Sequence, residues 1–391
     1  MRFNLWEDCN RVPLTELLSF VVDNRGKTVP TAPSGHKLIA TNCVTNNALF
    51  PVYEKIRYLS EETYQTWFRA HPIPGDILFV NKGTPGRVCL VPDPVDFCIA
   101  QDMIALRADE SKIYPKYLFA VLRSREIQQQ IYNTNVGDVI PHFKKQFLDQ
   151  LLIPIPERSI QESIGDLYYV LSLKAERNKK INDNLADLLQ TVYQERFGDT
   201  SLIANQGILS DICSYSRDKV AVSELNVSTY FSTENMLSGK AGSTEATSLP
   251  TTSQTTACHK GDTLISNIRP YFKKIVYCED NCGCSTDVLC FTPSQPRYSA
   301  YLFSTLYADK FFAFMVAGSK GTKMPRGDKQ QIMTYPVVLP SEEELAGFNT
   351  IASPLLEQIY SNSAENKRLS ILRDTLLPKL MSGEIAVSAI Q

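Results

Sequence analysis

The chain lacks long apolar segments and any sign of secretion. No apolar run of 18 residues occurs among its 391 residues, because Asp309 and Lys310 interrupt the best candidate, residues 301–318. The first eight residues lack the basic start and apolar core of a signal peptide. These absences predict a cytoplasmic protein that has no membrane partner, and the ten cysteines are then expected to be reduced.

Motifs for catalysis and cofactor binding are also lacking. The sequence contains no G-x-G-x-x-G, no Walker loop, no H-E-x-x-H, and neither Asn-Pro-Pro-Tyr nor Asp-Pro-Pro-Tyr, which amino-methyltransferases use on a flipped base. The four histidines, His36, His71, His142 and His259, show no triad spacing. We therefore predict a non-catalytic chain that binds no cofactor and no metal.

The chain has no large excess of charge of either sign. The formal net charge is −2 and the pI is about 6.2, which argues against nucleic-acid binding by bulk electrostatics. Residues 1–153 carry 17 basic and 16 acidic side chains, and residues 207–340 carry 13 and 11. Basic character is therefore local, and any nucleic-acid contact must use particular loops.

The chain contains an internal repeat at an offset of 184 to 188 residues. Residues 74–80 (PGDILFV) and 259–266 (HKGDTLIS) each place a Gly-Asp turn before an apolar, strand-like run. A proline-bounded stretch at 151–156 (LLIPIP) recurs at 335–340 (YPVVLP). Two copies of one architecture in one chain suggest two half-sites on one partner.

Each copy is followed by a predicted long amphipathic helix. Ser159 with Glu162, and Ser341 with Glu344, fit capping boxes at the two helix starts. Alternating spacings of four and three residues predict a coiled-coil seam. In the first helix the seam comprises Ile160, Ile164, Leu167, Leu171, Lys174, Asn178, Ile181, Leu185, Leu188 and Val192; in the second it comprises Phe348, Ile351, Leu355, Ile359, Asn362, Asn366, Leu369, Leu376 and Leu380.

Two features interrupt this pattern. Lys174 and Asn178 place polar residues at the centre of the first seam, where they set register at a cost in stability or simply face water. Pro354 is expected to kink or shorten the second helix, which also carries a four-residue stutter near Ile359.

These elements predict an α/β (α+β) fold with two pseudo-repeated domains and two long antiparallel helices. The expected boundaries are 1–156 for the first globular domain, 157–200 for the first helix, 201–340 for the second domain and 341–391 for the second helix. A helix over 159–197 would be roughly 58 Å long at about 1.5 Å per residue. Antiparallel packing would then hold the two globular copies apart as a built-in spacer.

Local basic elements recur at matching positions of the two copies. Residues 81–87 and 266–274 follow the repeated strands, and residues 142–145 and 320–326 form a second basic pair. Lys and Arg neutralise phosphates, and Asn and Arg offer paired donors to purine edges. The alternative interpretations are solvated turns and a charged sheet edge that preserves solubility. The predicted DNA contacts are Arg25, Lys27, Asn81, Lys82, Thr84, Arg87, Lys144, Lys145, Arg217, Asn267, Arg269, Tyr271, Lys273, Lys274, Lys320, Thr322, Lys323 and Arg326.

A cysteine cluster raises the question of a zinc site. Cys278, Cys282, Cys284 and Cys290 lie close together, with Cys258 upstream, but no clean C-x2-C pair occurs. The favoured interpretation is a hairpin made by residues 275–277 and 288–291, in which the thiols pack as small apolar groups and residues 279–286 form an exposed loop.

Taken together, these residues resemble the specificity (S) subunit of Type I restriction–modification systems. The resemblance covers almost the whole chain, and its most similar stretches are residues 153–197, 261–292 with Arg269-Pro270-Tyr271, and 376–385 (LLPKLMSGEI). It implies that each domain reads one half of a bipartite, asymmetric double-stranded DNA site while the helices set the unspecified spacer.

The resemblance also implies partners. The helices would dock two modification (M) subunits, which methylate adenine with S-adenosylmethionine, and restriction (R) subunits would join for ATP-dependent translocation and cleavage. S-adenosylmethionine, ATP and Mg are expected on those subunits. The helix residues expected to pair or to dock partners are Ile164, Leu167, Leu171, Asn178, Ile181, Leu185, Leu188, Phe348, Leu355, Asn366, Leu369, Leu376 and Leu380.

Three alternatives stay open. One is a coiled-coil adaptor whose globular copies bind protein, and the second is an enzyme with a zinc site at residues 278–290. The third is a specificity chain of a methylation-only system or of a fused restriction enzyme. The near-neutral charge further predicts that the isolated chain binds DNA weakly, because partner subunits would supply much of the phosphate clamp.

Overall fold

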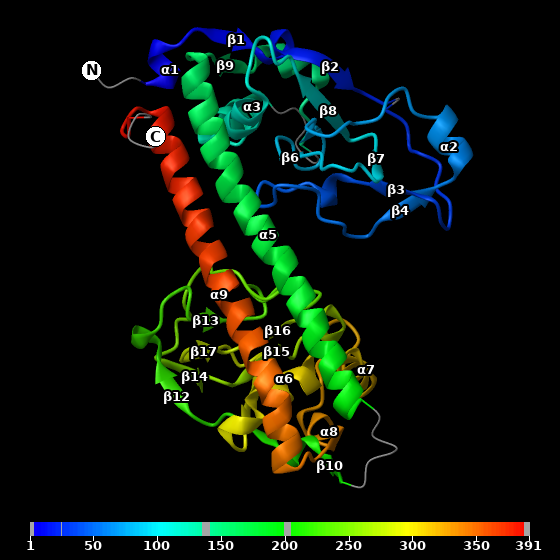
Figure 1. Ribbon diagram of the computed structural model, residues 1–391, viewed down its shortest axis with the longest axis vertical. Coiled ribbons are helices and arrows are strands. Elements are labelled where there is room, and N and C mark those ends of the chain that lie inside the picture. The colour runs from blue at the N-terminus through cyan, green and yellow to red at the C-terminus, as the bar shows by residue number, and fades with distance from the viewer. Residues whose placement is uncertain (1–3, 25, 135–140, 199–204, 387–391) are drawn as a thin grey trace. The chain divides into compact units, whose positions relative to one another are not determined.

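The computed structural model describes residues 4–24, 26–134, 141–198 and 205–386 (Figure 1). The chain divides into two compact units. Unit 1 comprises Met1–Lys179 with Glu365–Gln391, and unit 2 comprises Lys180–Ala364. Each of the two long helices therefore contributes one half to each unit. The boundary expected between residues 200 and 201 lies outside the described residues.

Unit 1 contains a four-stranded antiparallel sheet in the order β2-β8-β5-β6, a three-stranded sheet β4-β3-β7 and the pair β1-β9. Its strands are β1 (Arg11–Pro13), β2 (Leu18–Val22), β3 (His36–Ile39), β4 (Arg57–Leu59), β5 (Ile77–Val80), β6 (Val88–Leu90), β7 (Phe97–Ile99), β8 (Met103–Ala108) and β9 (Leu152–Pro154). Its short helices are α1 (Leu5–Asp8), α2 (Glu61–Thr66), α3 (Pro115–Leu122) and α4 (Arg125–Thr134).

Unit 2 repeats this arrangement with the sheets β11-β18-β15-β16 and β12-β14-β17-β13 and the pair β10-β19. Its strands are β10 (Gln206–Ile208), β11 (Cys213–Tyr215), β12 (Lys219–Ala221), β13 (Tyr230–Phe231), β14 (Gln254–Cys258), β15 (Thr263–Ser266), β16 (Ile275–Tyr277), β17 (Cys282–Cys284), β18 (Val288–Pro293) and β19 (Pro336–Val338). Its short helices are α6 (Ser299–Tyr307), α7 (Asp309–Ala317) and α8 (Lys329–Ile332).

The internal repeat read from the sequence is confirmed at the Gly-Asp turns and at the proline-bounded strands. The Gly-Asp turns precede β5 and β15, which hold the same place in their sheets. The proline-bounded stretches form β9 and β19, and each pairs antiparallel with the first strand of its unit. The α/β fold with two pseudo-repeated domains and two long helices is therefore confirmed.

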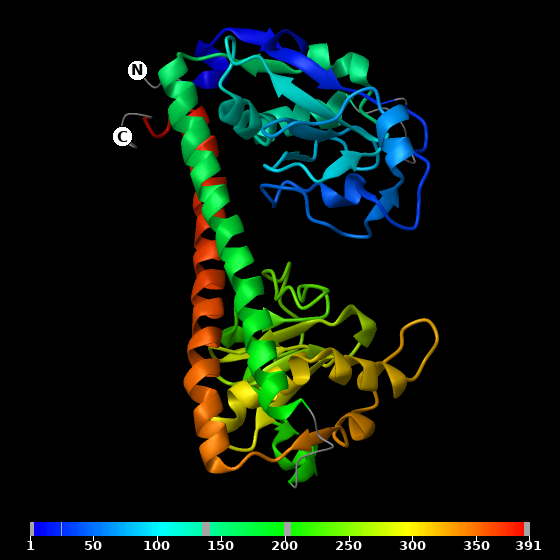
Figure 2. The ribbon, with the colours of Figure 1, turned by 45° about the vertical axis from the view of Figure 1, so that its right-hand side comes forward.

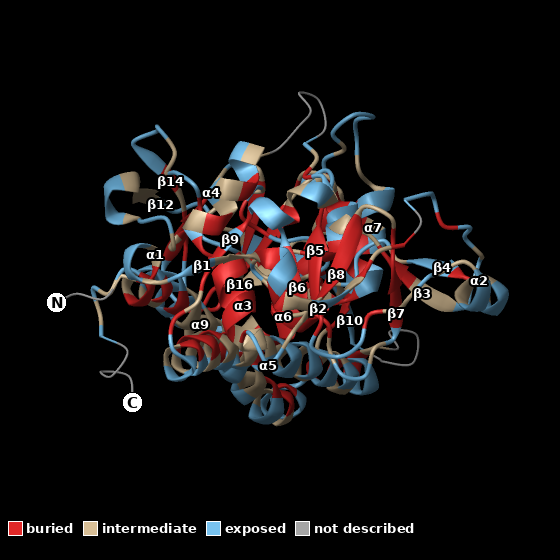
Figure 3. Ribbon diagram, turned by 90° about the horizontal axis from the view of Figure 1, so that it is seen from above, coloured by how far each residue is buried: buried red, intermediate tan, exposed pale blue. Residues whose placement is uncertain are grey.

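Each unit has its own core between the main sheet and the helices that cover it. In unit 1 the four residues of β5 are buried, and Tyr117 and Phe119 of α3 pack in the same cluster as Phe79. Figure 3 shows β5, β8 and α3 among the buried segments. In unit 2 Phe291 of β18 packs with Tyr301 of α6 in the corresponding cluster. Burying aromatic side chains of this size is a large part of what stabilises each unit.

The long helices α5 (Arg158–Phe197) and α9 (Glu342–Met381) each contain 40 residues. Within unit 1, Ile164 and Tyr168 of α5 share a core with Leu377 and Leu380 of α9, and Figure 2 shows these two segments side by side. Within unit 2, the rings of Phe197 and Phe348 pack edge to face with centroids 5.5 Å apart. Early residues of one helix thus meet late residues of the other, and the predicted antiparallel pair is confirmed.

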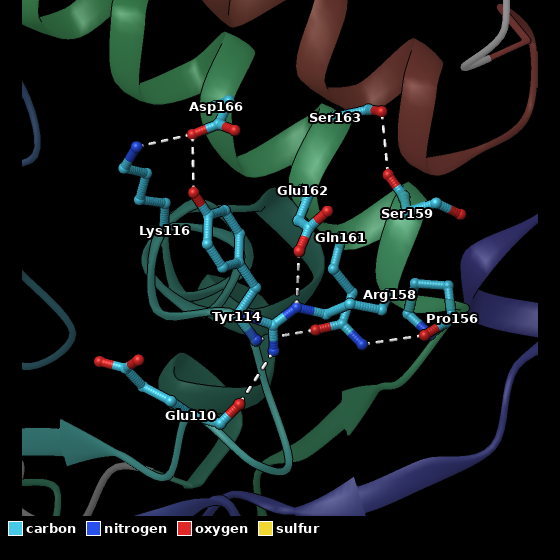
Figure 4. Close-up of polar contacts among 10 residues, drawn as sticks. All are labelled: Glu110, Tyr114, Lys116, Pro156, Arg158, Ser159, Gln161, Glu162, Ser163 and Asp166. Atoms are coloured by element: carbon cyan, nitrogen blue, oxygen red, sulfur yellow. Dashed lines mark hydrogen bonds and ion pairs between the residues drawn. The ribbon is translucent and has the colours of Figure 1, made fainter.

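The two predicted capping boxes have different outcomes. At α9, Ser341 and Glu344 exchange hydrogen bonds as expected, with Glu344 N 3.2 Å from the Ser341 hydroxyl. At α5 the prediction is wrong, because the helix already begins at Arg158 and Glu162 accepts from the Arg158 guanidinium at 3.0 Å (Figure 4). An i,i+4 ion pair replaces the cap there.

The start of α5 is anchored by other side chains. Gln161 donates to the Pro156 carbonyl and accepts from the Tyr114 amide, while Asp166 accepts from the Tyr114 hydroxyl and from Lys116 (Figure 4). Most of these partners lie about 50 residues upstream in the chain, so local pattern reading did not reveal them. Of the two effects expected of Pro354, a kink or a shortening, the shortening does not occur, because α9 continues through that residue.

The predicted seam holds at Asn178 and fails later in α5. Asn178 donates to Asn366 at 3.0 Å, and Asn366 donates back to the Ala175 carbonyl at 3.1 Å. Ile181 and Leu188, expected in the seam, are 45% and 48% exposed, while Asn182 bonds to α9 and Leu189 is buried. Ile351 of α9 is likewise exposed. The contact passes from Asn178 to Asn182, a spacing of four residues where the predicted seam has three, and this displaces the later contacts by one residue.

The predicted cysteine hairpin is wrong in its pairing. β16 and β18 do not pair with each other, because β15 lies between them. The segment expected as an exposed loop forms β17, which is buried and belongs to the other sheet of unit 2. The packing of the thiols is confirmed, since Cys258, Cys278, Cys282, Cys284 and Cys290 share one buried apolar cluster.

Candidate nucleic-acid interface

The Gly-Asp turn gives the central strand of each unit the same start. Gly75 and Gly261 have φ values of +87° and +91°, which glycine adopts at little cost. Each aspartate receives a side-chain hydrogen bond from the amide three residues earlier, at 3.0 Å for Asp76 and 2.8 Å for Asp262. The turns therefore fix the register of β5 and β15 and, through them, the positions of the loops at the other end.

Each central strand ends in a buried asparagine. Asn81 is 3% exposed and Asn267 is 6% exposed. Both backbone amides donate to an aspartate carbonyl, Asp102 in unit 1 and Asp287 in unit 2. Both side chains therefore lie beneath the loops that follow the strands, and their contact with DNA stays a prediction.

The structure joins the two basic elements of each copy. In unit 1, Lys82 forms a β-bridge with His142, and Phe143 N donates to the Asn81 carbonyl. In unit 2, Ile268 forms a β-bridge with Arg326, and Gly327 N donates to the Asn267 carbonyl. Segments about 60 residues apart in sequence therefore meet at the end of each central strand. We call each pair a strand-end cluster: residues 81–87 with 141–145, and residues 266–274 with 320–327.

The strand-end cluster of unit 1 presents free cations. Lys82, Arg87 and Lys144 are exposed, and among the described residues their side chains form no ion pair. Lys145 pairs with Asp23, and partial burial lowers the pKa of the Lys145 ammonium. Gln128 holds the loop by donating to the Gly86 carbonyl at 2.8 Å, and Thr84 is half-buried.

The strand-end cluster of unit 2 has more internal pairing. Lys320 pairs with Asp328 at 2.5 Å and Arg326 pairs with Asp287 at 2.9 Å. Lys273 pairs with Asp309 at 3.0 Å. Lys274 donates to the Thr233 carbonyl, and partial burial lowers its pKa. The exposed residues outside these pairs are Tyr271, Phe272, Gly321, Thr322, Lys323 and Met324, and the paired Lys320 and Arg326 are exposed as well. Lys323 forms no ion pair within the part of the chain that the structure describes.

Backbone strain accompanies the unit 2 loop. Arg269 and Lys273 both have a φ of +51°, a conformation that side chains other than glycine rarely adopt. The loop is held there because Arg269 N donates to the Pro325 carbonyl and Lys240 N donates to the Lys273 carbonyl. Strained residues held by several bonds are frequent at functional sites.

The remaining predicted contacts lie outside these clusters. Lys27 and Arg217 are exposed in other loops, and Arg25 lies outside the described residues. The acidic partners of the unit 2 cations went unnoticed in the sequence, because Asp287 and Asp309 are 36 or more residues distant from the bases that they pair with. Only the ion pair at residues 320 and 328 had a short spacing that could have been read.

Comparison with known proteins shows what parts of the chain resemble. Residues 21–186 match the model of the Type I restriction modification DNA specificity domain. Residues 21–186, less than half of the chain, are thus similar to this domain. The chain is 33% identical over 76 residues to the Type I restriction enzyme MjaIX specificity subunit of Methanocaldococcus jannaschii, covering 19% of this chain and 18% of that protein. It is 25% identical over 153 residues to the HindI specificity subunit of Haemophilus influenzae, covering 38% and 33%.

These matches span about a fifth to a third of the curated relatives' length. A solved structure extends the likeness in fold. The S subunit of the Type I restriction–modification system of M. genitalium superposes with a TM-score of 0.62 and 17% identity, covering 97% of this chain and 98% of that one. The architecture with two sheet-containing units and two long helices is thus the fold of a Type I specificity subunit.

Two further observations concern other function classes. None of the helices in the described ranges combines the length and hydropathy needed to cross a membrane. No group of three or more His, Cys, Asp or Glu side chains in the described part of the chain is arranged to hold a metal ion, so a zinc site at the cysteine cluster finds no support.

Proposed function

We propose that this chain is the DNA-recognition subunit of a Type I restriction–modification complex and that each unit reads one half of a bipartite, asymmetric site. The observation that carries the proposal is the recurrence of the strand-end cluster. In both units a loop after the central strand is bridged to a second basic segment. Such a recurrence is expected when two copies bind two equivalent surfaces of one duplex.

The clusters supply the two kinds of contact that specific DNA binding requires. Exposed Lys82, Arg87 and Lys144 in unit 1, and Lys323 in unit 2, are suited to phosphates and guanine edges. Tyr271, half exposed beside the strained Arg269, adds a planar group for base or sugar contact. The recognition domains in this proposal are 1–156 and 201–340, with the helices at 157–200 and 341–391 setting the spacer.

The helices provide surfaces for partner subunits. Ile181, Leu188 and Val170 of α5, and Ile371 and Leu372 of α9, are exposed large apolar side chains. Exposed apolar groups on helices that are already paired indicate protein contact. We assign these faces to two M subunits, with R subunits joining the complex. S-adenosylmethionine, ATP and Mg belong to the partners, and this chain carries no catalysis. The complex acts in the cytoplasm.

The test is a single-molecule methylome of the source strain with and without this gene. Loss of one bipartite adenine-methylated motif on deletion is the expected result. Complementation with Lys82→Ala/Arg87→Ala should weaken methylation through the half-site that unit 1 reads. Lys323→Ala should weaken it through the half-site that unit 2 reads. Arg57→Ala, an exposed cation outside both clusters, is the matched control. An unchanged methylome on deletion would favour a coiled-coil adaptor that binds protein.

A further inference from the structure

Unit 2 contains a cleft of about 360 Å³ on the side of α9 that faces α6 and the end of β16. Its polar lining comes from four segments that are distant in sequence. Lys260 belongs to the Gly-Asp turn, Glu279 follows β16, Ser299 starts α6, and Asn349 and Glu357 lie on α9. The strand-end clusters contribute no residue to it. The cleft is therefore separate from the proposed DNA-binding surface.

Two acceptors at this cleft have no donor. The side chain of Glu279 is 8% exposed, and its Oε1 atom is buried without a hydrogen-bond partner among the described residues. The Oδ1 atom of Asn349 is also buried and finds no partner in the described part of the chain, although its Nδ2 donates to the Arg297 carbonyl at 2.8 Å. Native structures satisfy nearly all buried polar atoms, so an unpaired carboxylate and an unpaired amide oxygen in one cleft indicate a missing donor.

The charges around the cleft favour a cation. Burial raises the pKa of Glu279, and the neighbouring Glu357 and Asp280 raise it further, while Lys260 opposes them. Lys260 is exposed and forms no hydrogen bond with either acceptor within the described chain. Arg297 is already paired with Glu342 at 2.5 Å. The cations that line the cleft therefore leave its two acceptors unsatisfied.

We propose that this cleft binds a guanidinium group. A guanidinium offers five N–H donors in one plane, which suits a carboxylate and an amide oxygen together, whereas an ammonium is a compact, strongly hydrated charge. Tyr277, Pro296 and Leu356 supply apolar lining for a stacked plane or an aliphatic stem. The group belongs either to an arginine side chain of a protein or to a free guanidino compound. The inference does not depend on the DNA-recognition proposal.

The test is isothermal titration of the full chain at fixed ionic strength. N-acetyl-arginine amide represents a protein side chain, and agmatine represents a free compound. We expect saturable binding of at least one probe, about tenfold weaker binding to Glu279→Gln, and weaker binding of N-acetyl-lysine amide. Glu343→Gln, at an exposed position of α9, should bind like the native chain. The tighter of the two guanidinium probes identifies the source.

A second variant keeps the test valid if Glu279→Gln unfolds. Asn349→Leu removes the other acceptor, and we expect at least threefold weaker binding while the melting temperature stays near that of the native chain. The proposal is overturned if neither guanidinium probe saturates. It is also overturned if the loss of affinity is the same for Glu279→Gln and Glu343→Gln.

Discussion

The Gly-Asp turns of the two units share their backbone hydrogen bonds and differ in their electrostatic surroundings. In unit 1 the Arg107 guanidinium holds Asp76 through two hydrogen bonds of 2.9 and 3.0 Å. In unit 2 the corresponding position of the paired strand is Thr292, as the registers of β5 with β8 and of β15 with β18 show. Asp262 instead accepts from the Cys290 thiol at 3.2 Å. The backbone of this turn is therefore compatible with two different partners for one buried carboxylate.

Replacing each aspartate by asparagine should give the largest difference in stability between the two units. Asp76→Asn leaves the Arg107 guanidinium, which is partly buried, without its ion pair, and we expect a loss of about 2 to 3 kcal/mol in the free energy of unfolding. Asp262→Asn removes a buried charge that no arginine or lysine of the described residues pairs with, and we expect a change of less than about 1 kcal/mol. Urea unfolding of both variants measures the difference. Equal losses in the two variants would contradict the comparison.

The same contrast predicts unequal DNA contributions from the strand-end clusters. Unit 1 has free cations, whereas most of those in unit 2 pair internally. In the assembled complex, Lys82→Ala/Arg87→Ala should weaken DNA binding by about 1 to 3 kcal/mol and reduce the salt slope by about 1.8, at about 0.9 per phosphate contact. Lys320→Ala should change the slope less, because its ion pair with Asp328 must first break. Binding measured over a series of salt concentrations decides this, and an equal effect of the two changes would refute it.

The sequence predicted the elements that recur in both units and missed the contacts that differ between them. The Gly-Asp turns, the proline-bounded strands and the seam positions of Asn178 and Asn366 could be read, because each leaves a local pattern that recurs at an offset of 184 to 188 residues. The counterions could not, because Arg107 and Asp76 lie 31 residues apart and meet only through strand pairing. The hairpin error has the same origin, since β15 enters between β16 and β18 from an earlier part of the chain. The burial of Asn81 could not be read either, because it depends on residues 141–145, which return to the end of β5 from a later part of the chain.

Supplying the missing cation should make unit 2 resemble unit 1. Thr292→Arg places a guanidinium at the register position that Arg107 occupies in the first copy. The residue facing it on β11 is Ser214, where β2 has Phe20 under the arginine, so the second sheet offers room at this position. We expect a gain of about 1 kcal/mol at neutral pH, measured by urea unfolding. Thr292→Gln, which has a similar length without charge, is the control, and an equal effect of both changes would exclude an ion pair as the cause.

The smallest expected effect is a dependence on pH at the Gly-Asp turn of unit 2. Burial raises the pKa of Asp262 above its ordinary value, although the His259 amide and charge, the Cys290 thiol and the Thr292 hydroxyl oppose the shift. A carboxyl with a raised pKa in the folded state contributes stability that is fully present below the unfolded pKa and is lost as pH rises through the folded pKa. Asp262→Asn should therefore gain stability relative to the native chain as pH rises from about 4 to 7, by less than about 1 kcal/mol. Unfolding measured at several pH values checks this, and a constant difference between the two proteins would mean that the pKa of Asp262 is the same in the folded and unfolded states.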